Sequence, residues 1–299
     1  MSILSELQAL YGSDVRITRR AHVAGGDIND ACILYLSDGQ EIFMKSNRIA
    51  HADFFVTEAE GLRAIAATET LRVPQVLARG TDEVEGCAFL LMEAVTGAQQ
   101  ARDFWEAFGH GLARMHLADT TAFVNGGRYG FTQDNYIGAG EQRNTPTDSW
   151  IAFFREHRLR PQMERAAHYF DAHLQKQCES LLEHLKDLLT EPERPSLLHG
   201  DLWGGNFMTG PDGHAWLIDP AAYVGHAEAD LAMTELFGGF HPRFYAAYEE
   251  INPLQKGYDT RRDIYNLYHL LNHLNLFGPG YLGSVARIVE RSESRGRVQ

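Results

Sequence analysis

The sequence carries the segment LLHGDLWGGN at residues 197–206 and ends a later hydrophobic run with IDP at residues 218–220. This is an H-x-D pattern in which Asn206 follows Asp201 and a second aspartate, Asp219, stands at the end of a predicted strand. Phosphoryl transfer needs these residue types, because one carboxylate must accept a hydroxyl proton while another carboxylate and an amide oxygen hold Mg²⁺ against the phosphates. A lone Asp in a loop more often satisfies its own backbone. The spaced set, flanked by strand residues, favours a catalytic loop over that alternative.

A second candidate is Lys45, which ends an otherwise apolar strand. An ammonium group is rarely placed there unless an anion binds it. A kinase-type lysine contacts phosphates and pairs with a glutamate on the next helix, which here offers Glu58 and Glu60. We expect Glu60 to face inward, because it precedes the apolar pair Leu62 and Ile65, and we assign Glu58 to the solvated face.

Two weaker signals concern nucleotide binding. Gly25 and Gly26 precede the first hairpin and could let backbone N–H groups approach phosphates, although a Gly-Gly pair is more often a simple turn. The run Glu93-Ala94-Val95 leaves a strand at the expected lobe boundary, where main-chain groups could pair with an adenine.

The hydrophobic patterns predict an α+β, bilobal protein. We expect an N-terminal lobe with a small antiparallel sheet over residues 1–92, a hinge at 93–97, and a larger, mainly helical lobe over 98–299. A hairpin signal, Asp-Gly, joins two of the expected strands. The expected helices lie near residues 3–10, 54–67, 105–117, 181–189 and 265–277, and the expected strands at 31–36, 41–45, 88–92, 206–208 and 215–218.

Composition restricts the partners and the compartment. Of 299 residues, 44% are hydrophobic and 22% charged, which is typical of a globular protein. The net charge of −13 repels phosphate backbones and anionic lipid, so we expect neither nucleic-acid nor membrane binding. The sequence shows neither a long apolar span nor a signal-peptide pattern. Its three scattered cysteines fit reduced thiols, and we expect a cytoplasmic protein.

Zinc chemistry was the competing interpretation of the histidines. His269 and His273 lie one helical turn apart, a spacing that can bind zinc. They sit in an apolar helix without an H-E-x-x-H motif or a cysteine pair, so buried or pocket histidines are the better interpretation.

Taken together, these residues resemble the aminoglycoside/choline kinase branch of the protein-kinase-like fold, which has H-G-D in this position. Further motifs resemble the fructosamine-3-kinase (ketosamine-3-kinase) family of bacteria, and the resemblance covers nearly the whole chain. These motifs lie at residues 131–138 (FTQDNYIG), 142–144, 150–162, 199–206, 218–226 (IDPAAYVGH), 231–240 (LAMTELFGGF) and 267–278.

The resemblance implies an enzyme that uses ATP and Mg²⁺ to phosphorylate the 3-hydroxyl of a ketosamine, either a small molecule or a glycated amine or protein. The unstable product then releases the amine. By motif, Asp201 is the catalytic base, Asn206 and Asp219 are metal ligands, Lys45 and Glu60 form the phosphate-contacting pair, and Glu93 to Val95 form the adenine hinge.

For the sugar pocket we expect Trp203 to form an apolar platform, with Asp134, His269 or His273 supplying polar contacts. A tryptophan packed in the core beneath the loop is the alternative. Many relatives have Ser in place of Gly204, and many have Cys in place of Asp27. Two other functions stay open: a small-molecule kinase of the aminoglycoside or choline type, and an ATP-binding regulator with little turnover.

Overall fold

The computed structural model describes residues 2–23 and 28–296, so Gly25 and Gly26 of the predicted phosphate-binding turn lie outside the described residues. The chain forms two compact units. One comprises Met1–Phe104 with Phe207–Asp219, and the other comprises Trp105–Asn206 with Pro220–Gln299.

This division differs from the predicted lobes of 1–92 and 98–299, because the hairpin of β9 (Phe207–Thr209) and β10 (Ala215–Leu217) belongs to the first unit. The main-chain N–H of Leu217 donates to the carbonyl of Arg72 at 2.8 Å. Arg72 also forms an ion pair with Asp212 in the turn between the two strands. Contacts between segments far apart in the sequence therefore decide the boundary.

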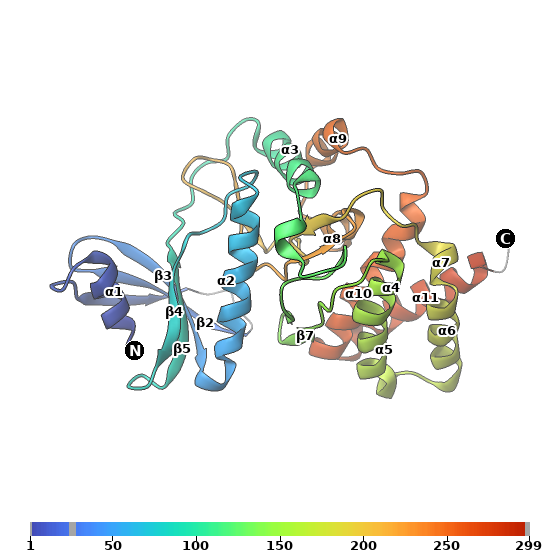
Figure 1. The fold of residues 1–299 in the computed structure, drawn as a ribbon, viewed down its shortest axis with the longest axis horizontal. Helices are drawn as coiled ribbons and strands as arrows, with labels where there is room; N and C mark the ends of the chain where they lie inside the picture. Colours follow the sequence, from blue (N-terminus) through green and yellow to red (C-terminus); the bar gives the residue numbers. More distant parts are fainter. Residues whose placement is uncertain (1, 24–27, 297–299) are drawn as a thin grey trace. The chain divides into compact units, whose positions relative to one another are not determined.

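The first unit is built on a five-stranded antiparallel sheet with the order β1-β2-β3-β5-β4. Its helices α1 (Ile3–Tyr11) and α2 (Ala52–Ala67) lie on opposite faces of this sheet (Figure 1). Two hydrophobic clusters result, one with Ile3 and Leu7 of α1 and the other with Phe55 and Leu62 of α2. The strands are β1 (Ile17–His22), β2 (Asp30–Leu36), β3 (Glu41–Arg48), β4 (Val76–Asp82) and β5 (Cys87–Glu93).

The expected β2–β3 hairpin is confirmed. The N–H of Leu36 donates to the carbonyl of Gln40 at 2.9 Å, and Gly39 in the turn has a φ of +91°, a conformation that glycine adopts without steric cost. In this register Lys45 lies opposite Leu90 of β5, in the middle of the sheet. The hairpin thereby carries the lysine into the interior of the first unit.

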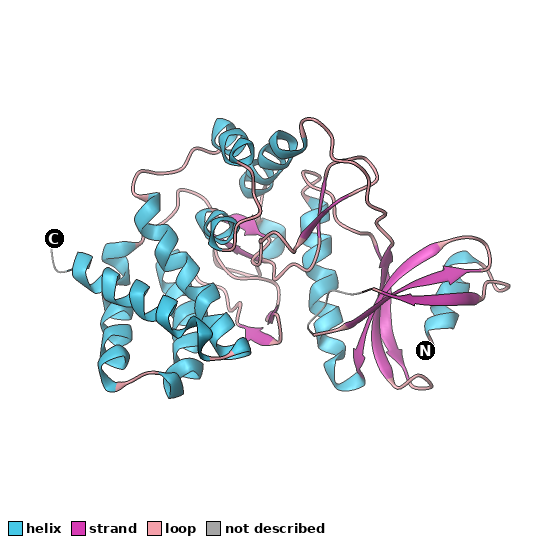
Figure 2. Cartoon of the chain, turned by 180° about the vertical axis from the view of Figure 1, so that it is seen from behind, coloured by secondary structure: helices cyan, strands magenta, loops and turns pink. Residues whose placement is uncertain are grey.

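The second unit is mainly helical (Figure 2). Its long helix α10 (Tyr258–Phe277) is buried on most sides, as expected, and contacts α5, α8 and α11. The expected single helix near 181–189 is two helices, α6 (Ala172–Glu183) and α7 (Leu185–Leu188), because the backbone leaves the helical conformation at His184. The other α-helices are α3 (Phe104–Leu117), α4 (Trp150–Phe154), α5 (Arg160–Ala166), α8 (Glu228–Leu236), α9 (Pro242–Ile251) and α11 (Leu282–Gly296).

Short antiparallel strand pairs hold the loops of this unit together. The segment of residues 125–147 contains the hairpin of β6 (Asn135–Ile137) and β7 (Gly140–Gln142). β8 (Ser196–Leu198) pairs with β11 (Tyr223–Gly225), which anchors both ends of the segment containing the H-x-D pattern. Short 3-10 or π turns lie at Ile49–His51, Thr121–Phe123, Arg155–Leu159, Ala167–Tyr169 and Pro279–Tyr281.

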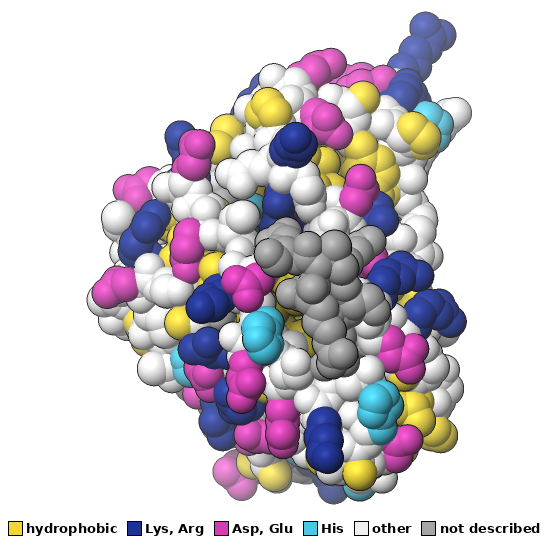
Figure 3. Space-filling model, turned by 90° about the vertical axis from the view of Figure 1, so that its right-hand side faces the viewer, with side chains coloured by type: hydrophobic (Ala, Val, Ile, Leu, Met, Phe, Trp, Pro, Cys, Tyr) yellow, Lys and Arg dark blue, Asp and Glu magenta, His cyan; other side chains and the backbone are white. Residues whose placement is uncertain are grey.

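Acidic and basic side chains are interspersed over the face of the molecule drawn in Figure 3. Within the described part of the chain, no helix combines the length and the apolarity that crossing a bilayer would require.

Candidate active site

The first unit brings Lys45, Glu58 and Asp219 together. The Nζ of Lys45 donates to Oε1 of Glu58 at 2.6 Å and also to Oδ1 of Asp219. The Lys45 and Glu58 side chains are almost buried, whereas the Asp219 side chain is 44% exposed. The predicted lysine and metal-binding aspartate are therefore neighbours, and the aspartate remains accessible.

The predicted partner of this lysine was wrong. Glu60 is exposed and forms an ion pair with Arg63 at 2.7 Å, while Glu58, assigned to the solvated face, is the buried partner. The sequence did contain the signal. Glu58 follows Phe55 by three residues and precedes Leu62 by four, so it lies on the apolar stripe of α2. Two residues further along a helix of 3.6 residues per turn, Glu60 falls on the opposite side.

Charge pairing outweighs burial at the lysine. Burial alone would lower the pKa of Lys45, but the carboxylates of Glu58 and Asp219 raise it above its ordinary value. Lys45 is thus a permanent cation. Burial raises the pKa of Glu58, the nearby Asp219 adds to this, and Lys45 opposes both. Lys45 is therefore a fixed positive charge within the cluster, and Asp219 is the carboxylate that stays accessible.

The backbone at Asp219 is unusual. Its φ of +56° lies in the left-handed region, where non-glycine residues are uncommon and Asp is tolerated better than most. Such conformations persist where the surroundings hold them, and they occur often at functional sites.

The predicted hinge residues Glu93 to Val95 are half-buried at the point where the chain leaves β5. Glu93 Oε2 accepts a hydrogen bond from the main-chain N–H of Gln75 at 3.2 Å.

The second unit holds Asp201 and Asn206 together. The Asn206 Nδ2 donates to the main-chain oxygen of Asp201 at 2.8 Å and to its Oδ2 at 3.0 Å. Gly200 begins the turn with a φ of +82°, and a Cβ there would lie 2.1 Å from the carbonyl oxygen of Ala221. Glycine is therefore required at the centre of the H-G-D motif. The loop presents a half-exposed carboxylate of fixed orientation.

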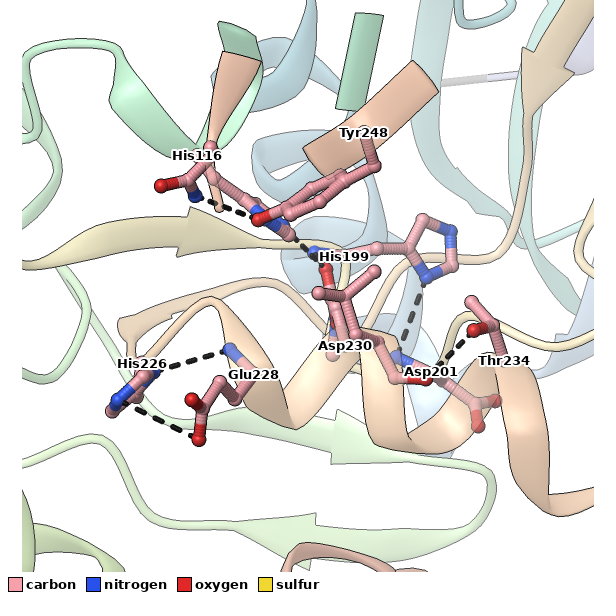
Figure 4. A network of polar contacts seen from close by, with 11 residues as sticks. His116, His199, Asp201, His226, Glu228, Asp230, Thr234 and Tyr248 are labelled. Atoms are coloured by element: carbon pink, nitrogen blue, oxygen red, sulfur yellow. Dashed lines mark hydrogen bonds and ion pairs between the residues drawn. The ribbon is translucent and has the colours of Figure 1, made fainter. Parts of the chain in front are cut away.

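A buried carboxylate that the sequence analysis missed clamps this loop. The N–H groups of His199 and Gly200 donate to Oδ2 and Oδ1 of Asp230 at 2.7 and 2.9 Å (Figure 4). His116 contacts the same carboxylate at 3.2 Å and the hydroxyl of Tyr248 at 2.8 Å. Although burial opposes it, these interactions lower the pKa of Asp230, with the largest contribution from His116. The sequence did contain a signal for this residue, because Asp230 is a charged residue within the apolar run of α8.

Buried amides hold the segment that follows Asp219. Asn135 Nδ2 donates to the carbonyl of Ala222 at 2.8 Å, and Gln142 Nε2 donates to that of Ala221 at 3.0 Å. Asn144 Nδ2 donates to Asn135 Oδ1 at 2.8 Å, which joins these amides into one network. The residues at 131–144 that carried the family resemblance thus have a structural role beside the catalytic loop.

The predicted sugar-pocket residues have different environments. Trp203 is 40% exposed, so the alternative of a core tryptophan is wrong. His273 is half-buried and its ring lies 4.8 Å from that of Phe237. His269 is 4% exposed and buried in α10, which corrects its assignment as a direct substrate contact in this conformation. Asp134 is exposed, and its Oδ1 accepts from the N–H of Asn144 at 2.6 Å.

Two oxygen donors fit a divalent cation. Because Nδ2 of Asn206 is turned toward Asp201, the amide places its Oδ1 on the other side, as a metal ligand requires. Asp219 is an accessible carboxylate, and hard cations prefer oxygen ligands of these two types. Asn206 and Asp219 belong to different compact units, as do Asp201 and Lys45.

The fold and these residues define a phosphotransferase of the protein-kinase-like class. The sequence matches the Fructosamine kinase family over residues 1–294, and the chain belongs to that family. Kinases of this family use ATP as the phosphate donor.

Three relatives illustrate the similarity. A protein described as a probable ketoamine kinase from Synechocystis sp. is 41% identical over 286 residues, covering 94% of this chain and 92% of the relative. The chloroplastic protein-ribulosamine 3-kinase of Oryza sativa subsp. indica is 39% identical, with 93% and 80% covered. The crystal structure of a fructosamine-3-kinase-like protein from Thermobifida fusca is 33% identical, with a TM-score of 0.83 and 98% and 99% covered.

Proposed function

We propose that this enzyme transfers the γ-phosphoryl group of ATP to the 3-hydroxyl of a ketosamine. The observation that carries the proposal is the half-exposed Asp201 carboxylate, held by Asn206 on a loop clamped by Asp230, in a chain that matches the Fructosamine kinase family almost throughout. The reaction needs a carboxylate at a fixed position beside the attacking hydroxyl.

In the proposed mechanism Asp201 accepts the proton of the 3-hydroxyl. The hydroxyl oxygen bonds to the γ-phosphorus, and ADP leaves. Lys45, kept protonated by its two carboxylates, binds the phosphates. Asn206 Oδ1 and Asp219 would hold Mg²⁺, which neutralises charge on the phosphates when bound. Ala94 and Val95, beside Glu93, would bind the adenine through main-chain groups.

Trp203 supports the sugar part of the substrate in this proposal. Its ring lies against the loop backbone, since a Cβ on Gly205 would lie 2.4 Å from the ring. An exposed ring two residues after Asp201 offers an apolar face to a sugar, and positioning of this kind can lower a barrier by several kcal/mol, up to about 7–11 in good cases. We also propose a cytoplasmic location, which the three scattered cysteines of the sequence support.

The experiment is an ATP-consumption assay with a panel of ketosamines, choline and aminoglycosides. We expect turnover with ketosamines and a phosphate on the 3-hydroxyl, identified by NMR. Asp201→Asn should reduce kcat by about 10²–10⁴ while ATP still binds. Turnover of choline or an aminoglycoside alone would establish the small-molecule kinase alternative. ATP binding without turnover of any compound would establish the regulator alternative.

A further inference from the structure

The second unit completely buries the side chain of Arg158. This residue is 0% exposed and lies in the π turn Arg155–Leu159, between α4 and α5. Its guanidinium donates to three uncharged oxygens, which are the carbonyls of Arg143 and His157 and, at 2.7 Å, Oδ1 of Asn144. Arginine is rarely buried in this way without a specific partner, and a single π turn within a helix often marks a functional site.

Aromatic rings surround this cation where a carboxylate would be expected. The guanidinium carbon lies 3.9 Å from the ring centre of Tyr223, 4.6 Å from that of Phe153 and 5.7 Å from that of Tyr268. Ring faces attract the planar cation, while its N–H groups donate hydrogen bonds within the plane. A lysine ammonium has no such plane, so this arrangement requires arginine.

Arg158 determines how two buried amides are oriented. Because an arginine only donates, the Asn144 amide must turn its oxygen toward Arg158 and its NH₂ toward Asn135. The Asn135 oxygen accepts that bond, and its own NH₂ therefore donates to the carbonyl of Ala222 at 2.8 Å. The two asparagines are 1% and 4% exposed, so bulk water does not compete for these bonds. The direction of each hydrogen bond from Arg158 to Ala222 thus follows from the one cation.

The segment that these amides hold is the one that follows Asp219. Ala222 comes three residues after Asp219, and Gln142 holds the neighbouring carbonyl of Ala221 at 3.0 Å. The Ala221 carbonyl also packs against Gly200, where a Cβ would lie 2.1 Å from its oxygen. Asp219 has a left-handed φ of +56°, a conformation that persists only where the surroundings hold it. The buried amides therefore fix the backbone after Asp219 against the H-G-D loop.

We propose that Arg158 is a positioning residue for phosphoryl transfer, which acts through the buried amides to keep Asp219 in the conformation of a metal ligand. This inference rests on the proposed function, in which Asp219 holds Mg²⁺ against the phosphates. Without the guanidinium, the amide of Asn135 can turn over and present its oxygen to the carbonyl oxygen of Ala222. Two acceptors form no hydrogen bond, so the segment loses its support. A displacement of about 1 Å in a catalytic group can lower the rate about 10²-fold.

The test compares Arg158→Lys, which keeps the charge and loses the planar fork, with Arg261→Lys. Arg261 is a similarly buried arginine of the same unit, 4% exposed, but it pairs with Glu228. Arg158→Lys should lower kcat about tenfold to a hundredfold and leave the KM for the ketosamine little changed. In calorimetry it should weaken Mg-ATP binding about fivefold or more, with ATP binding in EDTA less affected. Hydrogen–deuterium exchange of the unliganded variant should be faster in residues 221–224. Arg261→Lys should lower the free energy of unfolding without these effects.

Asn144→Asp tests the same inference without removing the cation, and it serves if Arg158→Lys does not fold. The new carboxylate still accepts from Arg158 but cannot donate to Asn135, so the variant should show the same losses of kcat and Mg-ATP affinity. Normal kcat and normal Mg-ATP affinity in either folded variant would overturn the inference, as would equal losses in Arg261→Lys. If the wild type phosphorylates no ketosamine, the proposed function fails, while calorimetry and hydrogen exchange still decide the role of Arg158.

Discussion

Acidification from pH 7 to pH 5 should destabilise the second unit through two buried histidines. His226 and His269 are almost completely buried, and burial lowers the pKa of each to about 3. Next to His226, the cation Arg261 adds to this effect. Glu228 lies 3.9 Å from His226 but already forms a two-pronged ion pair with Arg261, so it compensates little.

The direction of this change in stability follows from proton linkage. In the unfolded chain a histidine titrates near 6.5, whereas in the folded chain these two stay neutral down to about 3. Their contribution to stability is complete above pH 6.5 and is lost as the pH falls, because only the unfolded state takes up the protons. At pH 5 the loss is about 2 kcal/mol for each histidine, or about 4 kcal/mol together. A typical domain is stable by about 5–15 kcal/mol, so the change is large.

Urea unfolding followed by circular dichroism at pH 7, 6 and 5 measures this loss. The matched variant is His226→Asn. His226 Nδ1 accepts from the N–H of Glu228 at 3.1 Å, and an asparagine Oδ1 can accept the same bond without titrating. The variant should lose about 2 kcal/mol less than the wild type between pH 7 and pH 5. Wild-type stability that is constant or rising toward pH 5, or a variant with an undiminished loss, would refute the reasoning.

Five substitutions test the remaining assignments. Glu58→Gln should lower kcat/KM for ATP about tenfold or more, since a buried ion-pair partner is removed, whereas Glu60→Gln should change it by less than about twofold; equal effects in steady-state kinetics would restore the original assignment. Asp230→Asn should lower the free energy of unfolding by about 2–3 kcal/mol, reduce kcat, and leave the KM for ATP little changed; normal kcat would remove Asp230 as a positioning residue. Asp219→Asn should weaken Mg-ATP binding in calorimetry, with ATP in EDTA less affected, and unchanged Mg-ATP affinity would exclude Asp219 as a metal ligand. Trp203→Ala should raise the KM for the ketosamine and lower kcat while the melting temperature stays nearly constant; a large fall in melting temperature with normal kinetics would show a structural role.

Much of the site could be predicted because its residues are close in the sequence. Asp201 and Asn206 occupy one loop, so their spacing placed them in one predicted set, and in the structure Asn206 Nδ2 donates to Asp201 Oδ2. The hairpin of β2 and β3 was equally local, since an Asp-Gly turn fixes the register of its two strands. The partner of Lys45 also has a local signal, the helical spacing of Phe55, Glu58 and Leu62, although the prediction of Glu60 was wrong.

The tertiary structure alone decided the features that depend on distant segments. Asp230 is about 30 residues from the H-G-D loop in the sequence. Its hydrogen bonds to that loop exist only because the fold brings α8 and the loop together. The hairpin of residues 207–219 joins the first unit through Arg72, which no local pattern around it predicts. The contacting rings of Trp203, Phe237 and His273 likewise come from three segments: the loop that follows Asp201, the end of α8, and α10. Local patterns determine the backbone conformation and which face of each helix or strand is apolar. Long-range packing determines which of those faces come into contact.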